Sequence, residues 1–284
     1  MVLIADSGST KTEWVRLEDQ FKKQYFHCIG LNPITVSDNQ IKTEIRATFP
    51  DKNSRLSISN IFFFGAGCWN KETCGLIEKE LIALFPNASI QVESDLIGAV
   101  KATCGNQAGI TCILGTGSNS CSYDGQQIMD AIPSLGYQLG DEGSGAYLGK
   151  ELIKSFFYRE LPKDLEEHFQ RIYCLQKGDV IDKVYRKAHA NRYLASFTPF
   201  LSDHLQHPFV RSLLKSSFEE FLVRHVFKYG QYQTLPIHFV GSIAYHFQEP
   251  LKDCLEQYQL CVGNILKTPI EGLELYFRDI LDGF

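Results

Sequence analysis

The sequence lacks most of the short patterns that identify common classes of site. Neither the P-loop pattern GxxxxGK[ST] nor the dinucleotide pattern GxGxxG occurs, which argues against both of these nucleotide sites. The nine cysteines include no CxxC pair, and the eight histidines include no HExxH motif. These spacings fit neither a zinc site nor a disulfide framework, so we expect buried free thiols and packed histidines.

Long apolar runs and basic clusters are missing as well. The longest apolar stretch, residues 61–69, is too short to span a bilayer. The net charge is -5 and the lysines and arginines are scattered, so we expect neither a nucleic-acid partner nor a membrane partner. A strand-like segment begins at Val2 with no basic region ahead of it, and we therefore expect a cytoplasmic protein.

What is present is the composition of an ordinary globular protein. Of the 284 residues, 44% are apolar and 21% are charged. This length suits two domains, each large enough to bury a core of its own. We find no short repeat and no low-complexity segment in the sequence.

Strand and helix patterns alternate, and their order restarts after a hinge near residues 105–109. Each half opens with a strand, a glycine-rich turn and a second strand. We expect strands at 2–6, 12–18, 24–28, 58–65, 89–93, 110–114, 120–123, 126–131, 237–240 and 260–266. We expect helices at 38–49, 72–85, 95–104 and 270–281, and a mostly helical stretch at 143–229 that breaks at Pro162, Gly178 and Pro208.

Three turns that contain glycine follow or join the expected buried strands. They lie at residues 6–12 (DSGSTKT), 115–119 (GTGSN) and 241–244 (GSIA). Glycine lets the backbone approach a ligand, and the hydroxyls and amides of such turns can donate to phosphate oxygens. Asp6 ends the first strand, where its carboxylate could hold a hydrated Mg²⁺. Each turn alone is also typical of an ordinary hairpin, but three of them in a strand order that restarts indicate a nucleotide site.

These motifs together resemble those of the actin-like ATPase superfamily of sugar kinases and chaperones. DSGSTKTEW resembles its first phosphate hairpin, GTGSN its second phosphate turn, and FVGSIA its adenosine turn. LGDEGSGAY at residues 139–147 is similar to a signature of the BadF/BadG/BcrA/BcrD-type group, which contains N-acetylglucosamine kinase. GLNP at residues 30–33 is similar to a sugar-contacting loop of that group, and the resemblance covers most of the chain.

The resemblance implies an α/β protein of two ribonuclease H-like (actin-like ATPase) domains with a cleft between them. The first domain would comprise residues 1–106 with the terminal helix 270–284, and the second would comprise residues 107–269. The implied activity is ATP-dependent phosphorylation of the 6-hydroxyl of N-acetylglucosamine or a related amino sugar. ATP and Mg²⁺ would be the cofactors, and the group also implies a homodimer.

The resemblance also implies which residues contact each ligand. Those expected at ATP are Ser9, Thr10, Lys11, Thr12, Thr116, Gly117, Gly241 and Ser242, and Asp6 would hold Mg²⁺ through water. Those expected at the sugar are Asn32, Ser118, Asn119, Gly136 and Asp141. Ser7 stands where the first hairpin more usually has glycine, and this puts the backbone geometry of the hairpin in question.

Asp95 is the candidate for the general base. Phosphoryl transfer needs a group that orients and deprotonates the attacking hydroxyl. Asp95 begins the helix expected after the strand at 89–93, and the resemblance implies that it accepts the proton of the sugar hydroxyl. Ser94 and Asp95 would also make a good N-cap for this helix, so the sequence by itself leaves both roles open.

Three other polar residues also have structural alternatives. We expect Asp141 to cap the helix that follows it as well as to accept sugar hydroxyls, and Glu142 to lie in the first turn of that helix. Lys11 is expected at the phosphate, with a solvated surface lysine as the alternative.

Two further functions compete with the kinase. ATPases that activate radical dehydratases occur in the same wider group and share a [4Fe–4S] cluster between two subunits. In this sequence Cys112 lies near the second glycine turn, but inside an expected buried strand. A sugar-binding sensor without catalysis is the third candidate, although it would not need both Asp6 and Asp95.

Overall fold

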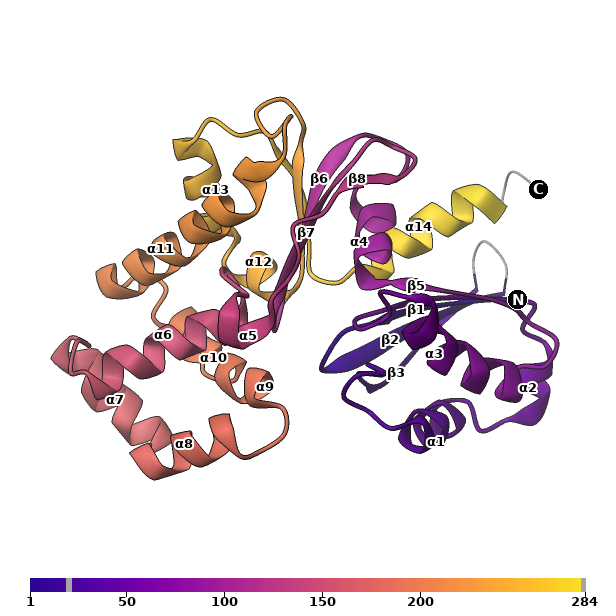
Figure 1. The fold of residues 1–284 in the computed structure, drawn as a ribbon, viewed down its shortest axis with the longest axis horizontal. Coiled ribbons are helices and arrows are strands. Elements are labelled where there is room, and N and C mark those ends of the chain that lie inside the picture. Colours follow the sequence, from indigo (N-terminus) through magenta and orange to yellow (C-terminus); the bar gives the residue numbers. More distant parts are fainter. Residues whose placement is uncertain (19–21, 282–284) are drawn as a thin grey trace. The chain divides into compact units, whose positions relative to one another are not determined.

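The computed structural model describes residues 1–18 and 22–281, which form two compact units (Figure 1). Unit 1 runs from residue 1 to residue 106 and includes the segment that begins at Thr268, and unit 2 comprises residues 107–267. Each unit contains one five-stranded mixed sheet with helices packed on it, so the predicted α/β class is confirmed. No helix in the described ranges is long and apolar enough to cross a bilayer.

The two sheets have the same topology. In each unit the first three strands form an antiparallel meander, and the fourth and fifth strands run parallel to the first. Across each sheet the order is therefore third, second, first, fourth, fifth. The strands of unit 1 are β1 (Val2–Ser7), β2 (Lys11–Leu17), β3 (Lys23–Ile29), β4 (Asn60–Gly65) and β5 (Ser89–Ser94). Those of unit 2 are β6 (Gly109–Leu114), β7 (Ser118–Tyr123), β8 (Ile128–Asp130), β9 (Ile237–Val240) and β10 (Val262–Leu266).

Helices cover both faces of the unit 1 sheet, because apolar residues of β1 point alternately to either side. Leu3 and Ala5 belong to the core that α1 and α3 cover, whereas Val2 and Ile4 pack with Phe277 of α14. A strand that is buried on both faces reads as a continuous apolar run, as VLIA does here. The helices of unit 1 are α1 (Asp38–Thr48), α2 (Lys52–Leu56), α3 (Lys71–Leu84), α4 (Asp95–Thr103) and α14 (Ile270–Leu281).

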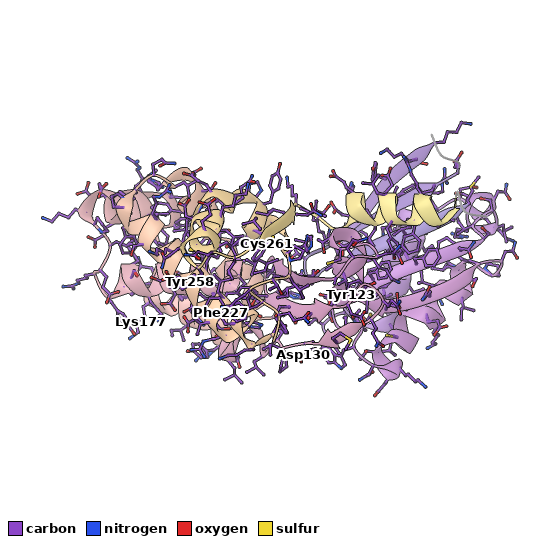
Figure 2. All side chains as sticks on the ribbon, turned by 90° about the horizontal axis from the view of Figure 1, so that it is seen from above. Tyr123, Asp130, Lys177, Phe227, Tyr258 and Cys261 are labelled. Carbon is purple, nitrogen blue, oxygen red and sulfur yellow. The ribbon has the colours of Figure 1, made fainter. Side chains whose placement is uncertain are left out.

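Unit 2 has a single large core that joins its sheet to the helices. Ile110 and Leu114 of β6 pack in this core with Leu148, Phe218 and Leu251 from three different helices. The helices are α5 (Gly136–Leu139), α6 (Gly145–Phe157), α7 (Lys163–Tyr173), α8 (Lys177–Tyr185), α9 (Ala190–Ala195), α10 (Thr198–Asp203), α11 (Pro208–Arg224), α12 (Ser242–His246) and α13 (Gln248–Gln257), with a 3₁₀ helix, η1, at Val226–Lys228. Figure 2 labels Phe227 of η1 and Tyr258, whose rings meet edge to face just beyond α13 with centroids 5.2 Å apart.

One predicted break in the helical stretch of unit 2 is wrong. Pro162 precedes α7 and Pro208 is the first residue of α11, as predicted. Gly178, in contrast, lies inside α8, and α7 ends at Cys174 with a left-handed backbone φ of 46°. Glycine usually takes that position, so the sequence gives no signal for a cysteine there.

The C-terminal helix α14 is tied to the meander of unit 1 by one buried carboxylate. Glu274 is 4% exposed and accepts hydrogen bonds from Lys23 Nζ at 3.0 Å and from Tyr25 Oη at 2.6 Å. Arg278 Nη2 lies 2.7 Å from the same carboxylate. Burial by itself would raise the pKa of Glu274, but the bonds from Tyr25 and Lys23 and the charge of Arg278 lower it below its ordinary value.

We expect Glu274→Gln to lower the free energy of unfolding of unit 1 by about 1–3 kcal/mol. The loss is no larger because Lys23 and Arg278 are partly exposed, so that water screens their attraction to the carboxylate. A carboxyl with a lowered folded-state pKa stabilises above its ordinary pKa of 4.5, so the effect should fade as pH drops below that value. Urea unfolding followed by tryptophan fluorescence reports on this unit, since both tryptophans, Trp14 and Trp69, belong to it. Glu78→Gln, an exposed change on α3, should have little effect. Equal effects of Glu274→Gln and Glu78→Gln would contradict the role of Glu274 in holding α14 on unit 1.

Candidate functional site

The predicted phosphate residues of unit 1 lie at one end of its sheet. β1, β4 and β5 are parallel, and their carboxyl ends carry Asp6, Gly65 and Ser94. The turn between β1 and β2, which holds Ser9 and Thr10, and Lys11, the first residue of β2, are at the same end. Ligands of sheets that contain parallel strands bind outside the carboxyl ends of those strands. The fold therefore brings Asp6, Ser9, Thr10, Lys11 and Asp95 to one end of one sheet.

Ser7 and Thr12 tie the first hairpin to the loop that carries Asn32. Both side chains are fully buried, and their hydroxyl oxygens are 2.9 Å apart. The Leu31 amide donates to Ser7 Oγ at 3.0 Å and to Thr12 Oγ1 at 3.2 Å. Thr12 in turn donates to the Ile29 carbonyl at 2.8 Å, which leaves the Ser7 hydrogen for Thr12 Oγ1. The hydroxyls of Ser7 and Thr12 therefore fix the position of the loop.

This geometry answers the question raised by Ser7 and revises the expectation for Thr12. The hairpin pairs Ser7 with Thr12 in regular register, and the Gly8 amide donates to the Lys11 carbonyl at 3.0 Å, so serine does not distort it. The Thr12 hydroxyl is buried and its hydrogen is donated to the Ile29 carbonyl, so the contacts of this side chain lie inside unit 1. We assign Thr12 a positioning role instead. Asn32 Oδ1 accepts from the Ile34 amide at 2.9 Å, just past the fixed residue Leu31.

A group of acidic side chains surrounds Asp6. Glu13 stands opposite Asp6 in the antiparallel pair of β1 and β2, so both carboxylates are on the same face of the sheet. Glu13 Oε1 lies 2.8 Å from Lys11 Nζ, whereas the buried Glu13 Oε2 has no partner among the described residues. Burial raises the pKa of Asp6 to about 8, and the charges of Asp95 and Glu13 add to this while Lys11 opposes it. An excess of negative charge of this kind favours a bound cation.

Asp95 is not the helix cap. The hydroxyl of Ser94 accepts from the Ile97 amide at 3.4 Å and caps α4, so Asp95 is the first residue inside the helix. Burial raises the pKa of Asp95 to about 6, although the amides of Leu96 and of Asp95 itself lower it. The carboxylate can thus serve as a base near neutral pH without any loss of the cap.

In unit 2 the N-terminus of α6 holds the second glycine turn. The Gly145 amide donates to the Gly115 carbonyl at 2.8 Å, and the Ala146 amide donates to the Thr116 carbonyl at 3.0 Å. Ser144 caps α6 by accepting from the Tyr147 amide at 3.2 Å. The first amides of a helix have no partner within the helix, and here two of them fix a turn expected to bind phosphate.

The prediction that Asp141 caps α6 is therefore wrong, since Ser144 takes that position. Asp141 has a left-handed backbone with φ of 62°, and its Oδ1 accepts from the Ser118 amide and from Ser134 Oγ, both at 3.2 Å. Burial raises the pKa of Asp141 above its ordinary value, while these bonds oppose the rise. Its Oδ2 would be 3.0 Å from a Cβ on Gly117, so the carboxylate packs directly on the turn.

Glu142 also differs from its prediction. Its side chain is buried, and Oε1 lies 3.2 Å from Arg224 Nε, so it forms an ion pair rather than sitting in the first turn of α6. Ser118, expected at the sugar, is 4% exposed, and its Oγ has no partner among the described residues. A buried hydroxyl without a partner is costly, which is consistent with a ligand that completes it.

The third glycine turn lies directly against the second. β6 and β9 pair in parallel, so Gly115 and Gly241 follow their strands at the same edge of the sheet. Gly241 has φ of 126°, and a Cβ there would lie 2.3 Å from the Leu114 carbonyl oxygen. Ser242 begins α12 next to it. The structure thus groups the expected residues of unit 2 at this edge or in the segment bonded to it, namely Thr116, Gly117, Ser118, Asn119, Gly136, Asp141, Gly241 and Ser242.

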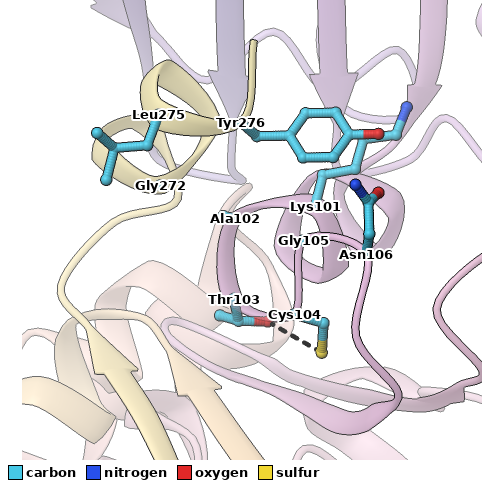
Figure 3. A pocket seen from close by; sticks show the side chains of 9 residues that line it. All are labelled: Lys101, Ala102, Thr103, Cys104, Gly105, Asn106, Gly272, Leu275 and Tyr276. Carbon is cyan, nitrogen blue, oxygen red and sulfur yellow. Dashed lines mark hydrogen bonds between the residues drawn. The ribbon is translucent and has the colours of Figure 1, made fainter. Parts of the chain in front are cut away.

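A separate cavity of about 340 Å³ lies on unit 1 between the C-terminus of α4 and α14 (Figure 3). Its lining includes Lys101, Cys104, Asn106 and Tyr276. None of the residues expected to bind ATP or sugar lines it, and Asp95 is at the opposite end of α4. This cavity is therefore not part of the candidate site.

Sequence reasoning missed two contributors to the site. Glu13 belongs to the hairpin motif of residues 6–12 and its flanking strand. The predicted antiparallel pairing of the two strands already places Glu13 opposite Asp6, so this contact had a signal in the sequence. Ser134 lies in a segment without regular structure, and nothing in the sequence points from it to Asp141.

Two units of identical topology, with glycine turns and carboxylates at the carboxyl ends of their parallel strands, define an actin-like ATPase fold. A solved structure from Porphyromonas gingivalis, a proposed N-acetylglucosamine kinase, matches with a TM-score of 0.92 and 42% identity, over 98% of this chain and 99% of that one. The chain belongs to this family of N-acetylglucosamine kinase-like proteins.

Two more distant structures share the fold. A proposed N-acetylglucosamine kinase from Chromobacterium violaceum matches with a TM-score of 0.76 and 18% identity, over 97% of this chain and 98% of that one. A glucokinase of the ROK family from Streptomyces griseus, solved with glucose and AMPPNP, matches with a TM-score of 0.56 and 10% identity, over 98% of each chain. No family model matches the chain, and no curated protein matches it significantly.

We expect Gly241→Ala to destabilise unit 2 by about 2–4 kcal/mol, because the new Cβ meets the Leu114 carbonyl and the backbone is left-handed. Hydrogen exchange of the β9 amides would measure the loss. Gly230→Ala is the matched control, since a Cβ there meets nothing within 4 Å. A protein that tolerates both changes equally would contradict the close approach of the two turns.

Proposed function

We propose that the chain is an ATP-dependent sugar kinase that phosphorylates the 6-hydroxyl of N-acetylglucosamine or of a close relative such as glucosamine or N-acetylmuramic acid. The relative with 42% identity supports the substrate class. The observation that carries the proposal is the pairing of Asp6 and Asp95. These carboxylates lie at the carboxyl ends of β1 and β5, close enough that the charge of Asp95 raises the pKa of Asp6. The Asp6 carboxylate suits a metal ion, and the Asp95 carboxylate suits a general base.

In the proposed reaction Asp95 accepts the proton of the sugar 6-hydroxyl. The hydroxyl oxygen then forms a bond to the γ-phosphorus of ATP, and the bond from that phosphorus to the β,γ-bridging oxygen breaks. The products are the sugar 6-phosphate and ADP. An aspartate whose pKa is raised to about 6 remains largely ionised at neutral pH and is still a useful proton acceptor.

The hairpin residues Ser9, Thr10 and Lys11 are our candidates for the phosphates, since they lie next to Asp6 at the open end of the sheet. The donor set fits a hydrated Mg²⁺, because that ion prefers one or two carboxylates with water and phosphate oxygens. Asp6 would hold it, and the unpartnered Oε2 of Glu13 adds negative charge on the same face. Mg²⁺ would neutralise charge on the phosphates when it is bound with ATP.

On unit 2, Thr116 and Gly117 are our candidates for the nucleotide, with Gly241 and Ser242 beside them for adenosine. Ser118, Asn119, Gly136 and Asp141 are the candidates for the sugar, together with Asn32 of unit 1. The Ser118 hydroxyl, which has no partner among the described residues, and the carboxylate of Asp141 supply a donor and an acceptor of the kind that sugar hydroxyls require. We also expect a cytoplasmic protein, and the group that the sequence resembles suggests a homodimer.

The alternative of an iron–sulfur activator is less well supported. Cys112 is fully buried in β6, the central strand of its sheet, and packs in the core of unit 2. A cluster shared between subunits needs thiolates at the surface, which a cysteine in this position does not provide. A sensor without catalysis has no use for the raised pKa of Asp95.

The direct test is an ADP-release assay with Mg-ATP and a panel of amino sugars. We expect release to be stimulated most by N-acetylglucosamine or a close relative, and to cease when Mg²⁺ is chelated. Product analysis by NMR would place the phosphate on O6. A preparation that is brown, contains iron and releases ADP without regard to sugar would instead favour the activator.

Asp95→Asn keeps the size of the side chain and removes the base, so we expect kcat to fall by about 100-fold or more. Ser94→Ala is the matched change, because it removes the cap and leaves the carboxylate. It should cost about 1 kcal/mol of stability and retain most of the turnover. Steady-state kinetics with urea unfolding of both variants would separate the two roles. Near-normal turnover of Asp95→Asn would remove Asp95 from the mechanism.

A further inference from the structure

A buried polar network lies behind the predicted sugar residues of unit 2. It consists of Tyr229, Ser120, His225 and Glu142, and we refer to it as the His225 network. The four side chains are 1%, 0%, 4% and 7% exposed, respectively. Buried polar groups are costly unless they are hydrogen-bonded, and a satisfied network fixes the relative positions of the segments that carry it.

The hydrogen bonds of this network run in one direction. The Ile132 amide donates to Tyr229 Oη at 3.1 Å, and Tyr229 Oη is 2.7 Å from Ser120 Oγ, which is 3.1 Å from His225 Nδ1. If Nδ1 carried the proton and donated to Ser120, one of the two buried hydroxyl hydrogens, that of Ser120 or that of Tyr229, would have no acceptor among the described residues. Tyr229 therefore donates to Ser120, and Ser120 donates to His225 Nδ1.

This order fixes the tautomer of His225. Its Nδ1 is an acceptor, so the proton of the neutral ring is on Nε2. This N–H faces Glu142 Oε2 at 3.9 Å, which is too long for a hydrogen bond but electrostatically favourable, whereas an Nε2 lone pair would face the carboxylate unfavourably. Burial lowers the pKa of His225, Arg224 adds to this, and Glu142 opposes it. The neutral ring is thus favoured at neutral pH. The imidazole also stacks on Phe221, with centroids 4.7 Å apart.

The network joins three segments that carry expected sugar contacts. Ser120 is on β7, which begins with Ser118 and Asn119. Ile132 leads into the segment of Ser134, whose hydroxyl bonds Asp141. Glu142 follows Asp141 directly, and its other oxygen is held by Arg224. His225 thus bonds the first segment directly through Ser120, and Tyr229 extends the chain of bonds to the second through the Ile132 amide. Glu142 of the third segment faces His225 Nε2 at 3.9 Å without a hydrogen bond.

We propose that His225 is a positioning residue for the amino sugar: in its neutral form, protonated on Nε2, it accepts from Ser120 and so fixes β7, while the Tyr229 hydroxyl that donates to Ser120 fixes the Ile132–Ser134 segment. This inference rests on the proposed function for the identity of the ligand. It differs from a purely structural role of a buried histidine, because it predicts an effect on the sugar alone.

The first test is His225→Phe, which keeps the ring that stacks on Phe221 and removes both nitrogens. We expect KM for the sugar to rise by about tenfold or more, the effect of one lost buried hydrogen bond, with KM for ATP changed by less than about twofold. Calorimetry of sugar binding should show the same change. An equal rise in both KM values, or no rise in either, would overturn the proposal.

Two variants distinguish positioning from packing. His225→Asn places an amide oxygen near the site of Nδ1 as an acceptor for Ser120, and it should restore KM for the sugar to within about threefold of wild type. His238→Phe alters another buried histidine of unit 2, whose Nδ1 accepts from the Asn264 amide at 3.0 Å outside the network. It should lower stability without changing KM for the sugar. Tyr229→Phe, which loses only the hydroxyl, takes the place of His225→Phe if that variant does not fold, and it should likewise raise KM for the sugar.

The tautomer can be read without any activity. In the ¹⁵N-labelled protein, long-range correlations of His225, identified by their absence from His225→Asn, should show an unprotonated Nδ1 and a protonated Nε2. A proton on Nδ1 would overturn the inference whether or not the protein is a kinase. If instead no amino sugar is phosphorylated or bound, the proposed function fails while the assigned tautomer stands.

Discussion

The parallel pairing of the first and fourth strands in each unit determines where the functional residues lie. β1 with β4 and β6 with β9 run in the same direction, so the turns that follow them meet at one edge of each sheet. The second strand of each unit runs antiparallel to the first and therefore begins at the same edge. The β1–β2 turn of unit 1 and the β6–β7 turn of unit 2 thus lie at this edge as well. If β5 or β9 ran the other way, Asp6 would lose the neighbourhood of Asp95, and Gly241 would lose that of Gly115.

Most of the strands and the glycine turns could be predicted from the sequence, because their signals are local. VLIA in β1 and the ITCIL run in β6 are apolar without interruption, and each precedes a turn rich in glycine and hydroxyl groups. The end of α7 could not be predicted, because a left-handed cysteine has no sequence signature. The cap of α6 was misplaced by three residues for a different reason. Asp141 and Ser144 are both good capping residues, and only the tertiary bonds of Asp141 decide between them.

The contacts that shape the site connect residues far apart in the chain. The sequence could therefore predict the site residues, but not the hydrogen bonds that hold them in place. Ser7 was noted as a departure from glycine, yet its bond to the Leu31 amide depends on how β3 returns beside β2. His225 was expected to be a packed, hydrogen-bonded histidine, but its partner Ser120 lies 105 residues earlier in the chain and could not be predicted. Two of the buried atoms without a partner among the described residues, Glu13 Oε2 and Ser118 Oγ, are on elements that adjoin the turns. Their desolvation destabilises the fold unless a ligand completes them.

The return of the chain to unit 1 at Thr268 bears on how the protein is made. Helix α14 supplies Leu273 and Phe277, which cover Val2, Ile4 and Val15 on one face of the first sheet. During synthesis that face has no such cover until the segment from Thr268 leaves the ribosome, after all of unit 2 has emerged. Strands β1 and β2 are therefore covered on this face only after unit 2 has been made, and until then the nascent chain exposes an apolar sheet face of the kind that chaperones bind.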